Sequence, residues 1–195
     1  MAVPSYNEVV VTIAGQRYLI SGDLIVEAET KMKIIGITGK AGSGKSTVAA
    51  CLMAELRNRF YPARRLAFAD PLKSICRQMG WNGVKDKRGR RLLQIIGTEA
   101  GRECIGQDVW INLLSQHIEG GIVIIEDCRF DNEVDWVRGQ GGIVLHLHGR
   151  QKYRWWHRAY WHKSERVPKH HDFAINTSGP APKIPEAVYA FAMGQ

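Results

Sequence analysis

The residues best suited to chemistry form a glycine-rich stretch near the start of the chain. Gly39, Lys40, Ala41, Gly42, Ser43, Gly44, Lys45 and Ser46 match the phosphate-binding pattern G-x-x-x-x-G-K-[ST], and Thr47 follows. The flanking sequence predicts an apolar strand before the pattern and a helix after it, which is the setting that this pattern requires. Glycines let successive backbone N–H groups turn toward phosphates, and the helix adds its positive N-terminal end. We therefore predict that Gly39–Thr47 holds the phosphates of a nucleoside triphosphate.

Two side chains of this motif are expected to act on the phosphates directly. Lys45 would reach the β- and γ-phosphates, and the Ser46 hydroxyl would help to coordinate a magnesium ion. A glycine-rich turn without a ligand would explain the glycines but not this lysine and serine. The motif identifies only the class of ligand, because motors, switches and kinases all use it.

A second group of candidates follows the apolar run Ile122–Ile125, which ends in Glu126 and Asp127. Such a run is typical of a parallel strand that is buried on both faces. Doubly wound sheets bind their ligands at the C-terminal ends of such strands. We predict that Asp127 holds the metal ion together with Ser46, with Glu126 as a reserve candidate. The alternative is that Asp127 only caps the helix that follows it in sequence.

Arg129 lies two residues beyond the predicted metal carboxylate. Its guanidinium group stays charged and bonds phosphate oxygens in pairs, so we predict that it contacts the transferring or the acceptor phosphate. Asp131 or Asn132 is expected to cap the helix predicted over residues 131–139, which explains both residues without a functional role.

Asp70 and Lys73 follow another predicted strand. Asp70 precedes Pro71, and this pair is a favourable helix start on local grounds alone. Lys73 would face an acceptor phosphate if the end of this strand lines the cleft. A substrate role and a structural role explain the pair about equally well.

Composition indicates a soluble globular protein with one main domain. The chain has 195 residues, a hydrophobic content of 45%, a charged content of 24% and a net charge of +8. The positive charge suits either nucleic acid or a pocket for two polyanionic nucleotides. Neither a membrane helix nor a secretory signal is apparent. The four cysteines form no CxxC pair, so we expect reduced thiols and a cytoplasmic protein.

From Lys33 onward, strand and helix signals alternate, which predicts a parallel sheet with right-handed crossovers. The expected strands are Ile34–Thr38, Leu66–Ala69, Ile122–Glu126, Ile143–Leu147 and Phe173–Ile175. The expected helices cover residues 45–59, 71–79, 90–104, 108–118, 131–139 and 183–193. Residues 151–170 are aromatic and basic without a clean apolar face, so they resemble a flap over the site.

Residues 1–31 stand apart from this alternating pattern. Val9–Ile13 and Arg17–Ile20 flank a turn and predict a β-hairpin, and Leu24–Val26 is a candidate third strand. A lone hairpin is marginally stable in water, so we expect it to dock on the main domain or on a second copy of the chain. The predicted division is an extension over residues 1–31 and a main domain over residues 32–195.

The order of motifs from residue 32 to about 178 resembles that of the bacteriophage-type deoxynucleoside monophosphate kinases, in the superfamily of P-loop nucleoside monophosphate kinases. The likeness rests on the segments Gly39–Thr47, Phe68–Lys73, Leu93–Arg102 with Trp110, Asp127–Glu133, His162–Glu165 and Ile175–Asn176. The phosphate loop alone is unspecific, but several further motifs in the same order make the match fairly specific. The family pattern begins near Met32, so it does not explain the N-terminal hairpin.

This resemblance implies an α/β P-loop kinase fold in three layers. A five-stranded parallel sheet would carry helices on both faces, with a helical lid over about residues 150–170; the N-terminal β-hairpin would be an addition to this fold. The resemblance also implies transfer of the γ-phosphoryl group of ATP to a deoxynucleoside 5′-monophosphate, with Mg²⁺ required. The expected partners are small nucleotides, and we expect neither membrane contact nor a stable nucleic-acid complex.

The resemblance also implies roles for single residues. Lys45 and the loop amides would hold the donor phosphates, and Ser46 and Asp127 would serve the metal. The acceptor would be lined by Asp70, Lys73, Arg102, Trp110, Arg129 and Glu133. Apart from the resemblance, we predict that closure of the lid brings one or more of Arg150, Arg154 and Arg158 onto the phosphates and excludes water. His162, Ser164 and Glu165 lie in the same segment without assigned roles, as do the aromatic residues Trp155, Trp156, Tyr160 and Trp161.

Other functions remain open from the sequence. A P-loop kinase for another small acceptor, such as dephospho-coenzyme A or a nucleoside, would share the core architecture. A nucleic-acid-stimulated ATPase would explain the positive charge and the tryptophans. A nucleotide-binding structural subunit without turnover has less support, because Lys45, Ser46 and Asp127 are all present. The sequence does not indicate which bases are accepted, because base selectivity depends on the shape and hydrogen bonds of the pocket.

Overall fold

The computed structural model describes residues 9–13, 16–21, 24–27, 32–59, 61, 63–118, 120–149, 167–179 and 181–194, with backbone only before residue 32. The first three strands, β1 (Val9–Ile13), β2 (Gln16–Ser21) and β3 (Leu24–Glu27), form an antiparallel sheet of their own in the order β1-β2-β3. The predicted hairpin therefore has a third strand. The division of the chain at residue 31 stays a prediction.

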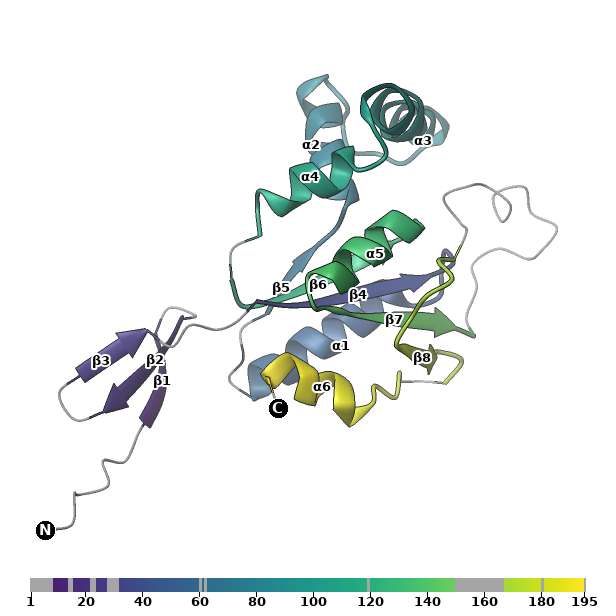
Figure 1. The fold of residues 1–195 in the computed structure, drawn as a ribbon. Helices are drawn as coiled ribbons and strands as arrows, with labels where there is room; N and C mark the ends of the chain where they lie inside the picture. The colour runs from purple at the N-terminus through teal and green to yellow at the C-terminus, as the bar shows by residue number, and fades with distance from the viewer. Residues whose placement is uncertain are drawn as a thin grey trace, which may run out of the picture.

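A parallel sheet of five strands forms the centre of the main domain (Figure 1). Its strands are β4 (Lys33–Gly39), β5 (Ala63–Leu66), β6 (Ile122–Cys128), β7 (Ile143–His148) and β8 (Phe173–Asn176). They lie in the order β5-β6-β4-β7-β8, and every neighbouring pair is parallel. The strand that precedes the phosphate loop is therefore central, with β6 beside it. The predicted α/β fold with a five-stranded parallel sheet is confirmed.

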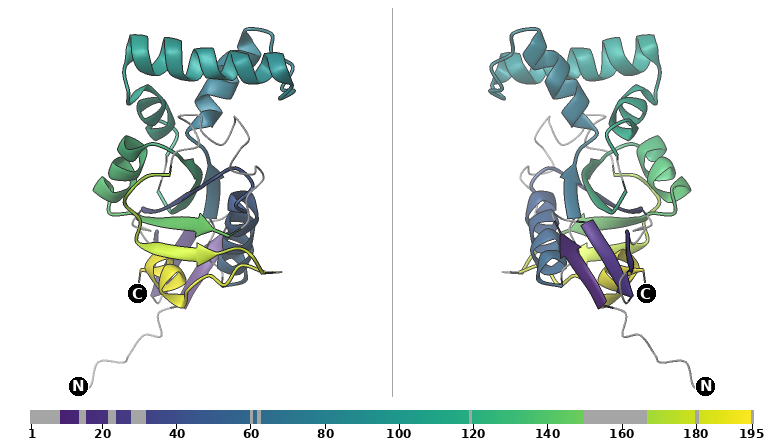
Figure 2. Two further views of the ribbon diagram at one scale, coloured as in Figure 1. Left: turned by 90° about the vertical axis from the view of Figure 1, so that its right-hand side faces the viewer. Right: turned by 90° about the vertical axis from the view of Figure 1, so that its left-hand side faces the viewer.

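Helices cover both faces of this sheet. They are α1 (Lys45–Asn58), α2 (Ala69–Gln78), α3 (Lys87–Gln94), α4 (Val109–Ser115), α5 (Asp131–Gly139) and α6 (Glu186–Met193), with a π-helix, η1 (Ile95–Ile105), after α3. In Figure 1, α1 and α6 lie on one side of the sheet and α5 on the other. Figure 2 shows α3 continuing into η1 as one long rod above the sheet.

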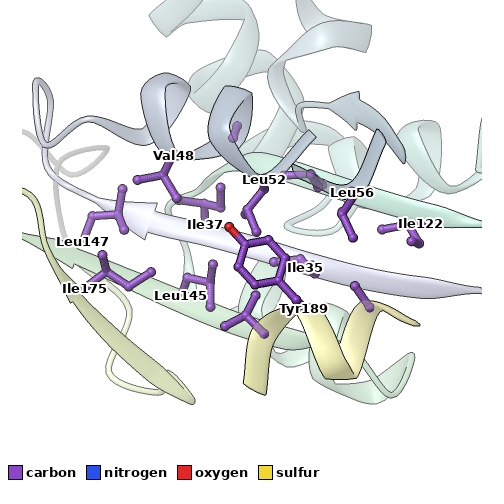
Figure 3. Close-up of a cluster of buried hydrophobic side chains, with 14 residues drawn as sticks. Ile35, Ile37, Val48, Leu52, Leu56, Ile122, Leu145, Leu147, Ile175 and Tyr189 are labelled. Carbon is purple, nitrogen blue, oxygen red and sulfur yellow. The ribbon is translucent and has the colours of Figure 1, made fainter. Parts of the chain in front are cut away.

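Two apolar clusters hold these layers together. The first packs α1 and α6 on one face of the sheet, with Ile35, Ile37 and Leu52 fully buried in it (Figure 3). The second packs α2, α4 and α5 on the opposite face, around Ile125 and Val144. Burial on both faces explains why β6 begins with four consecutive apolar residues rather than an alternating pattern.

Two predicted elements differ from the observed ones. The strand predicted over Leu66–Ala69 is Ala63–Leu66, and Ala69 already belongs to α2. Because β5 is an edge strand with Arg64 and Arg65 exposed, its first residues carry no apolar signal. The helix predicted over residues 90–104 begins at Lys87 and changes to a π-helix at Ile95. The other helix and strand bounds agree with the predictions to within three residues.

One glycine of η1 makes room for a tryptophan of α4, and a second accepts its hydrogen bond. A Cβ atom at Gly101 would lie 2.5 Å from Cζ2 of Trp110, too close for any side chain. The Trp110 indole N–H donates to Gly97 O at 2.8 Å. A π-helix changes which carbonyls are paired along its length, and such segments often occur at functional sites. The regular α-helical hydrogen-bond pattern is therefore lost where η1 meets Trp110.

Candidate functional site

The phosphate loop has the backbone conformation that its glycines predict. Gly39, Gly42 and Gly44 have φ values of +146°, +79° and +91°. At Gly39 a Cβ atom would lie 2.7 Å from both Leu147 O and Ser43 Oγ, so only glycine fits there. The loop runs from the end of β4 directly into α1, which begins at Lys45. This strand–loop–helix arrangement turns the N-terminus of α1 toward a ligand of the loop.

Lys45 folds back over the loop. Its ammonium group donates to Gly39 O at 2.5 Å and to Lys40 O at 2.8 Å. Ser46 and Thr47 are exposed in the first turn of α1. The ammonium group is thus held beside the loop, and the Ser46 hydroxyl is accessible to a ligand. These positions agree with the roles predicted for Lys45 and Ser46, which stay predictions.

Thr177 anchors the loop from the end of β8, and sequence reasoning missed it. Its hydroxyl oxygen lies 2.8 Å from two carbonyl oxygens, Ser43 O and His148 O, and its one proton can be donated to either. Its backbone N–H also donates to His148 O at 2.9 Å. Thr177 therefore ties the phosphate loop to the end of β7. A threonine after the last strand carries no recognisable signal in the sequence.

Asp127 lies at an irregularity in the pairing of β6 with β4. Gly36 pairs with Ile125 and Thr38 pairs with Cys128, so two residues of β6 lie opposite one residue of β4. Such bulges re-aim side chains and are frequent beside active sites. Glu126, the reserve candidate, has one buried carboxylate oxygen with no hydrogen-bond partner among the described residues; the Arg65 guanidinium is 3.7 Å from that oxygen.

The Asp127 carboxylate accepts two backbone hydrogen bonds from the start of α2. Phe68 N–H donates to Oδ1 at 2.7 Å, and Ala69 N–H donates to Oδ2 at 3.0 Å. Asp127 therefore caps α2 rather than the helix that follows it in sequence. Burial raises the pKa of Asp127, although these amides and the charges of Arg129 and Lys73 act in the opposite direction.

The donor set at this point fits a magnesium ion. A carboxylate has about four lone-pair sites, so the two amides leave Asp127 able to accept further bonds. The described residues include no cluster of three or more metal-ligating side chains. Mg²⁺ suits this setting, because it usually takes one or two protein oxygens and completes its shell with phosphates and water. Ser46 and Asp127 stay the predicted ligands.

A cavity of about 210 Å³ opens at the C-terminal end of β6, where Asp127 forms part of its wall. One water needs only about 10–15 Å³, so a small organic molecule fits. The apolar wall consists of Phe68, Leu72, Leu93, Trp110 and Phe130. Five of the six predicted acceptor residues line this cavity, namely Lys73, Arg102, Trp110, Arg129 and Glu133.

The sixth predicted acceptor residue, Asp70, is not part of this wall. Its carboxylate is half-exposed and forms an ion pair with Lys73, with 2.7 Å between the Oδ1 and Nζ atoms. Asp70 therefore acts on the cavity only indirectly, through its ion pair with Lys73. Its position in the first turn of α2 also suits a negative charge, since the N-terminal end of a helix is positive.

Three cations gather at one part of the cavity. They are Lys73 and Arg129, both predicted, and Lys85, which lies on the loop before α3. Burial, followed by the charges of Lys73 and Arg129, lowers the pKa of Lys85. Mutual repulsion of this kind is relieved when an anion binds among the cations. Sequence reasoning did not place Lys85 in the site.

Arg102 and Glu133 form a buried ion pair in the cavity wall, with 2.5 Å between Nη2 and Oε1. Arg102 also donates to Gln107 O at 2.7 Å and lies over the Phe130 ring. The other Glu133 oxygen accepts from the backbone N–H groups of Arg129 and Phe130, at 2.7 and 3.1 Å. Burial and the nearby Asp127 raise the pKa of Glu133 to about 7.

The cap predicted for α5 is wrong. Phe130 is the N-cap residue, and the Glu133 carboxylate accepts its backbone N–H. Asp131 instead accepts from Lys169 N–H at 3.2 Å, and Asn132 donates to Asp108 Oδ1 at 2.7 Å. A glutamate three residues into the helix has replaced the usual short polar cap.

The predicted lid residues lie outside the part of the chain that the structure describes. This applies to Arg150, Arg154 and Arg158, and also to His162, Ser164 and Glu165. Two further residues of the cavity wall, Gln94 and Thr98, were missed by sequence reasoning. The segment that contains them matches no generic motif, so only its position in the fold shows that they face the site.

Comparisons with known proteins agree with this geometry. The sequence profile of a family described as AAA domain matches residues 35–165, more than half of the chain. A candidate deoxynucleotide monophosphate kinase of Acanthamoeba polyphaga mimivirus is 26% identical over 150 residues, and the match covers 60% of this chain and 74% of that protein. The deoxynucleoside-5′-monophosphate kinase of Escherichia phage T5 is 36% identical over 52 residues, covering 25% of this chain and 21% of that protein.

Among solved structures, the APS kinase CysC of Mycobacterium tuberculosis matches with a TM-score of 0.42 and 16% identity, over 76% of this chain and 88% of that one.

Within the described residues, no helix is both long and apolar enough to cross a membrane.

Proposed function

The chain belongs to the AAA domain family, and from this premise we propose that it transfers the γ-phosphoryl group of ATP to a deoxynucleoside 5′-monophosphate. The family resemblance predicted from the order of motifs is confirmed by the two curated relatives, which carry deoxynucleotide kinase names. The acceptor, the metal and the path of transfer are proposals for this chain, supported by the geometry of the site.

The observation that carries the proposal is the composition of the cavity beside the phosphate loop. Its wall combines a cationic part, formed by Lys73, Lys85 and Arg129, with an apolar part rich in aromatic side chains. A nucleoside monophosphate has the same two parts, a phosphate and a flat base. Because β6 and β4 are parallel neighbours, the cavity at the C-terminal end of β6 lies at the same end of the sheet as the phosphate loop, which follows β4. A donor and an acceptor nucleotide would thus meet there.

The residues on the donor side would bind and position the triphosphate. Loop amides and the end of α1 would hold its phosphates, and Lys45 would exchange the Gly39 and Lys40 carbonyls for phosphate oxygens. Ser46 and Asp127 would hold Mg²⁺, which supplies charge neutralisation on the phosphates when it is bound. Asp127 would at the same time keep the start of α2 fixed through its two amide bonds.

On the acceptor side the chain has to position an anion and needs no strong base. The acceptor phosphate is already ionised at neutral pH, and phosphoryl transfer depends mainly on in-line positioning and charge stabilisation. Arg129 and Lys73 would hold this phosphate, and Lys85 would approach it from the loop before α3. One or more of the lid arginines Arg150, Arg154 and Arg158 would complete the charge stabilisation and exclude water.

An acceptor panel tests the proposal. ADP release by the full chain would be followed with ATP and Mg²⁺ and each of the four deoxynucleoside monophosphates, with dephospho-coenzyme A and nucleosides as alternative acceptors. We expect turnover with at least one deoxynucleoside monophosphate and none with the alternatives. Turnover only with another acceptor, or ATP hydrolysis stimulated by DNA without any acceptor, would contradict the proposed function.

A further inference from the structure

Two uncharged polar side chains of the cavity wall have no hydrogen-bond partner among the described residues. Gln94 is the last residue of α3 and Thr98 lies in the first part of η1, four positions later. This spacing places both side chains on the same side of the rod that α3 and η1 form. An amide and a hydroxyl group at the wall of a largely apolar cavity are therefore available to a ligand.

The other polar groups on the apolar side of the cavity are already bonded within the protein. The Trp110 indole N–H donates to Gly97 O. Arg102 is bonded to Gln107 O and to Glu133, and Glu133 also accepts two backbone N–H groups. Drawing any of these groups toward a ligand would leave a buried partner without its hydrogen bond, which is energetically costly. Gln94 and Thr98 carry no such penalty.

The charged groups of the cavity suit a different part of the ligand. Lys73, Lys85 and Arg129 offer only donors with positive charge, which match a phosphate. A base presents donors and acceptors along its edge, so it requires neutral groups that both donate and accept. A glutamine amide and a threonine hydroxyl have this property. Phe68 and Phe130 supply aromatic surface for the faces of the ring.

We infer that Gln94 and Thr98 hydrogen-bond the edge of the acceptor base and set the preference of the enzyme among deoxynucleoside monophosphates. This inference rests on the proposed function and deepens it. Residues at the junction of α3 and η1 would recognise the base, and Lys73, Lys85 and Arg129 would bind the phosphate.

The test measures how base preference changes in two variants. Gln94→Leu removes the amide and Thr98→Val removes the hydroxyl, while Thr98→Ser keeps it. For each protein, kcat/KM is measured with the four deoxynucleoside monophosphates. We expect each loss to lower kcat/KM for the preferred acceptor about 2- to 12-fold, the effect of one net hydrogen bond. Because the four bases differ at their edges, the ratios between acceptors should change, while the KM for ATP should not.

An acceptor analogue without a base separates base reading from a general disturbance of the cavity. The inhibition constant of 2-deoxyribose 5-phosphate against the preferred monophosphate should be the same in Gln94→Leu, Thr98→Val and the wild-type protein. The matched control is Gln78→Leu on the exposed side of α2, which should retain the wild-type ratios. Thr98→Ser should restore most of the activity that Thr98→Val loses.

Different results would overturn this inference and the proposed function. If Gln94→Leu and Thr98→Val both retain the wild-type ratios between acceptors, the inference is overturned while the proposed function stands. An equal loss for all four bases and for 2-deoxyribose 5-phosphate would also overturn it. Wild-type protein that phosphorylates none of the four monophosphates would instead overturn the proposed function.

Discussion

At the scale of single residues, Lys45 combines a structural contact with an expected catalytic one. Its ammonium group now bonds Gly39 O and Lys40 O, so the loop itself holds it in place. A ligand phosphate would take over these bonds at little structural cost. This arrangement lets the effects of Lys45 on turnover and on stability be measured separately.

We predict that Lys45→Met lowers kcat by about 10²- to 10³-fold, the usual effect of removing one preorganised donor to a developing charge. The free energy of unfolding should fall by only about 1 kcal/mol, because the lost hydrogen bonds are partly exposed. Coupled ADP release and urea unfolding measure the two quantities. Lys183→Met, an exposed change before α6, is the matched control. Full turnover by Lys45→Met would contradict the assignment of the phosphate loop.

The raised pKa of Glu133 predicts how the free energy of unfolding depends on pH. Its folded pKa is raised to about 7 from an ordinary value of 4.5. Between these values the folded protein binds more protons than the unfolded chain, so the contribution of Glu133 to stability falls as pH rises through this window. It is fully present below about pH 4.5 and is lost above about pH 7.

Urea unfolding of the wild-type protein and Glu133→Gln at pH 5 and pH 8 checks this prediction. The stability advantage of the wild-type protein over the variant should shrink by roughly 1–3 kcal/mol between these pH values. Subtracting the variant removes the effects of groups that titrate in both proteins. An advantage that stays constant, or that grows with pH, would show that Arg102 and the two amides outweigh burial.

At the scale of elements, periodic apolar patterns predicted some boundaries better than others. The helix predicted over residues 131–139 is observed as Asp131–Gly139, because its apolar positions all face one core cluster. The strand β5 was predicted three residues too late, because the exposed Arg64 and Arg65 interrupt the apolar pattern that would have marked it. The π-helix was not predicted, since its apolar pattern was interpreted as that of an α-helix, and the close approach of Trp110 to Gly101 appears only in the folded chain.

Two glycine substitutions test this packing. Gly101→Ala would place a Cβ atom 2.5 Å from Trp110 Cζ2 and 2.8 Å from Ile96 O, so we expect a loss of about 1–3 kcal/mol in the free energy of unfolding. Gly139→Ala, at the end of α5, meets no atom within 4 Å and should stabilise the protein by about 0.4–1 kcal/mol.

Urea unfolding measures both variants, and acceptor KM values add a second readout. Because Trp110 lines the cavity, Gly101→Ala should also raise the KM for the acceptor, whereas Gly139→Ala should leave it unchanged. Equal stabilities of the two alanine variants would mean that η1 adjusts freely and that the close contact with Trp110 is unimportant.

At the scale of the whole molecule, the site draws on segments that are far apart in sequence. The motifs predicted its phosphate loop and six of the residues in the cavity wall, Asp127 included, because each of these lies in a recognisable pattern. Lys85, Gln94, Thr98 and Thr177 were missed. Gln94 and Thr98 lie in a segment that carries the family likeness, but the likeness assigned no role to them, and Lys85 and Thr177 lie outside the matched segments. Only the folded chain shows that these four residues reach the site.

Residues 1–31 also have to be considered at the scale of the whole molecule. The strands β1, β2 and β3 pair only with one another, so none of them supplies a strand to the five-stranded sheet. The phosphate loop and the described cavity wall also come from residues after Met32. We therefore predict that a chain of residues 32–195 folds and keeps kcat within about 2-fold of the full chain, with a free energy of unfolding within about 1 kcal/mol.

Coupled ADP release and urea unfolding of the shortened and full chains measure these quantities, and sedimentation compares their masses. A change in mass alone would show that the hairpin joins two copies of the chain without serving catalysis. Loss of turnover or of cooperative unfolding would contradict the division at residue 31, because it would mean that the main domain requires β1–β3 for its stability. The active site would then depend on packing that lies beyond the parallel sheet.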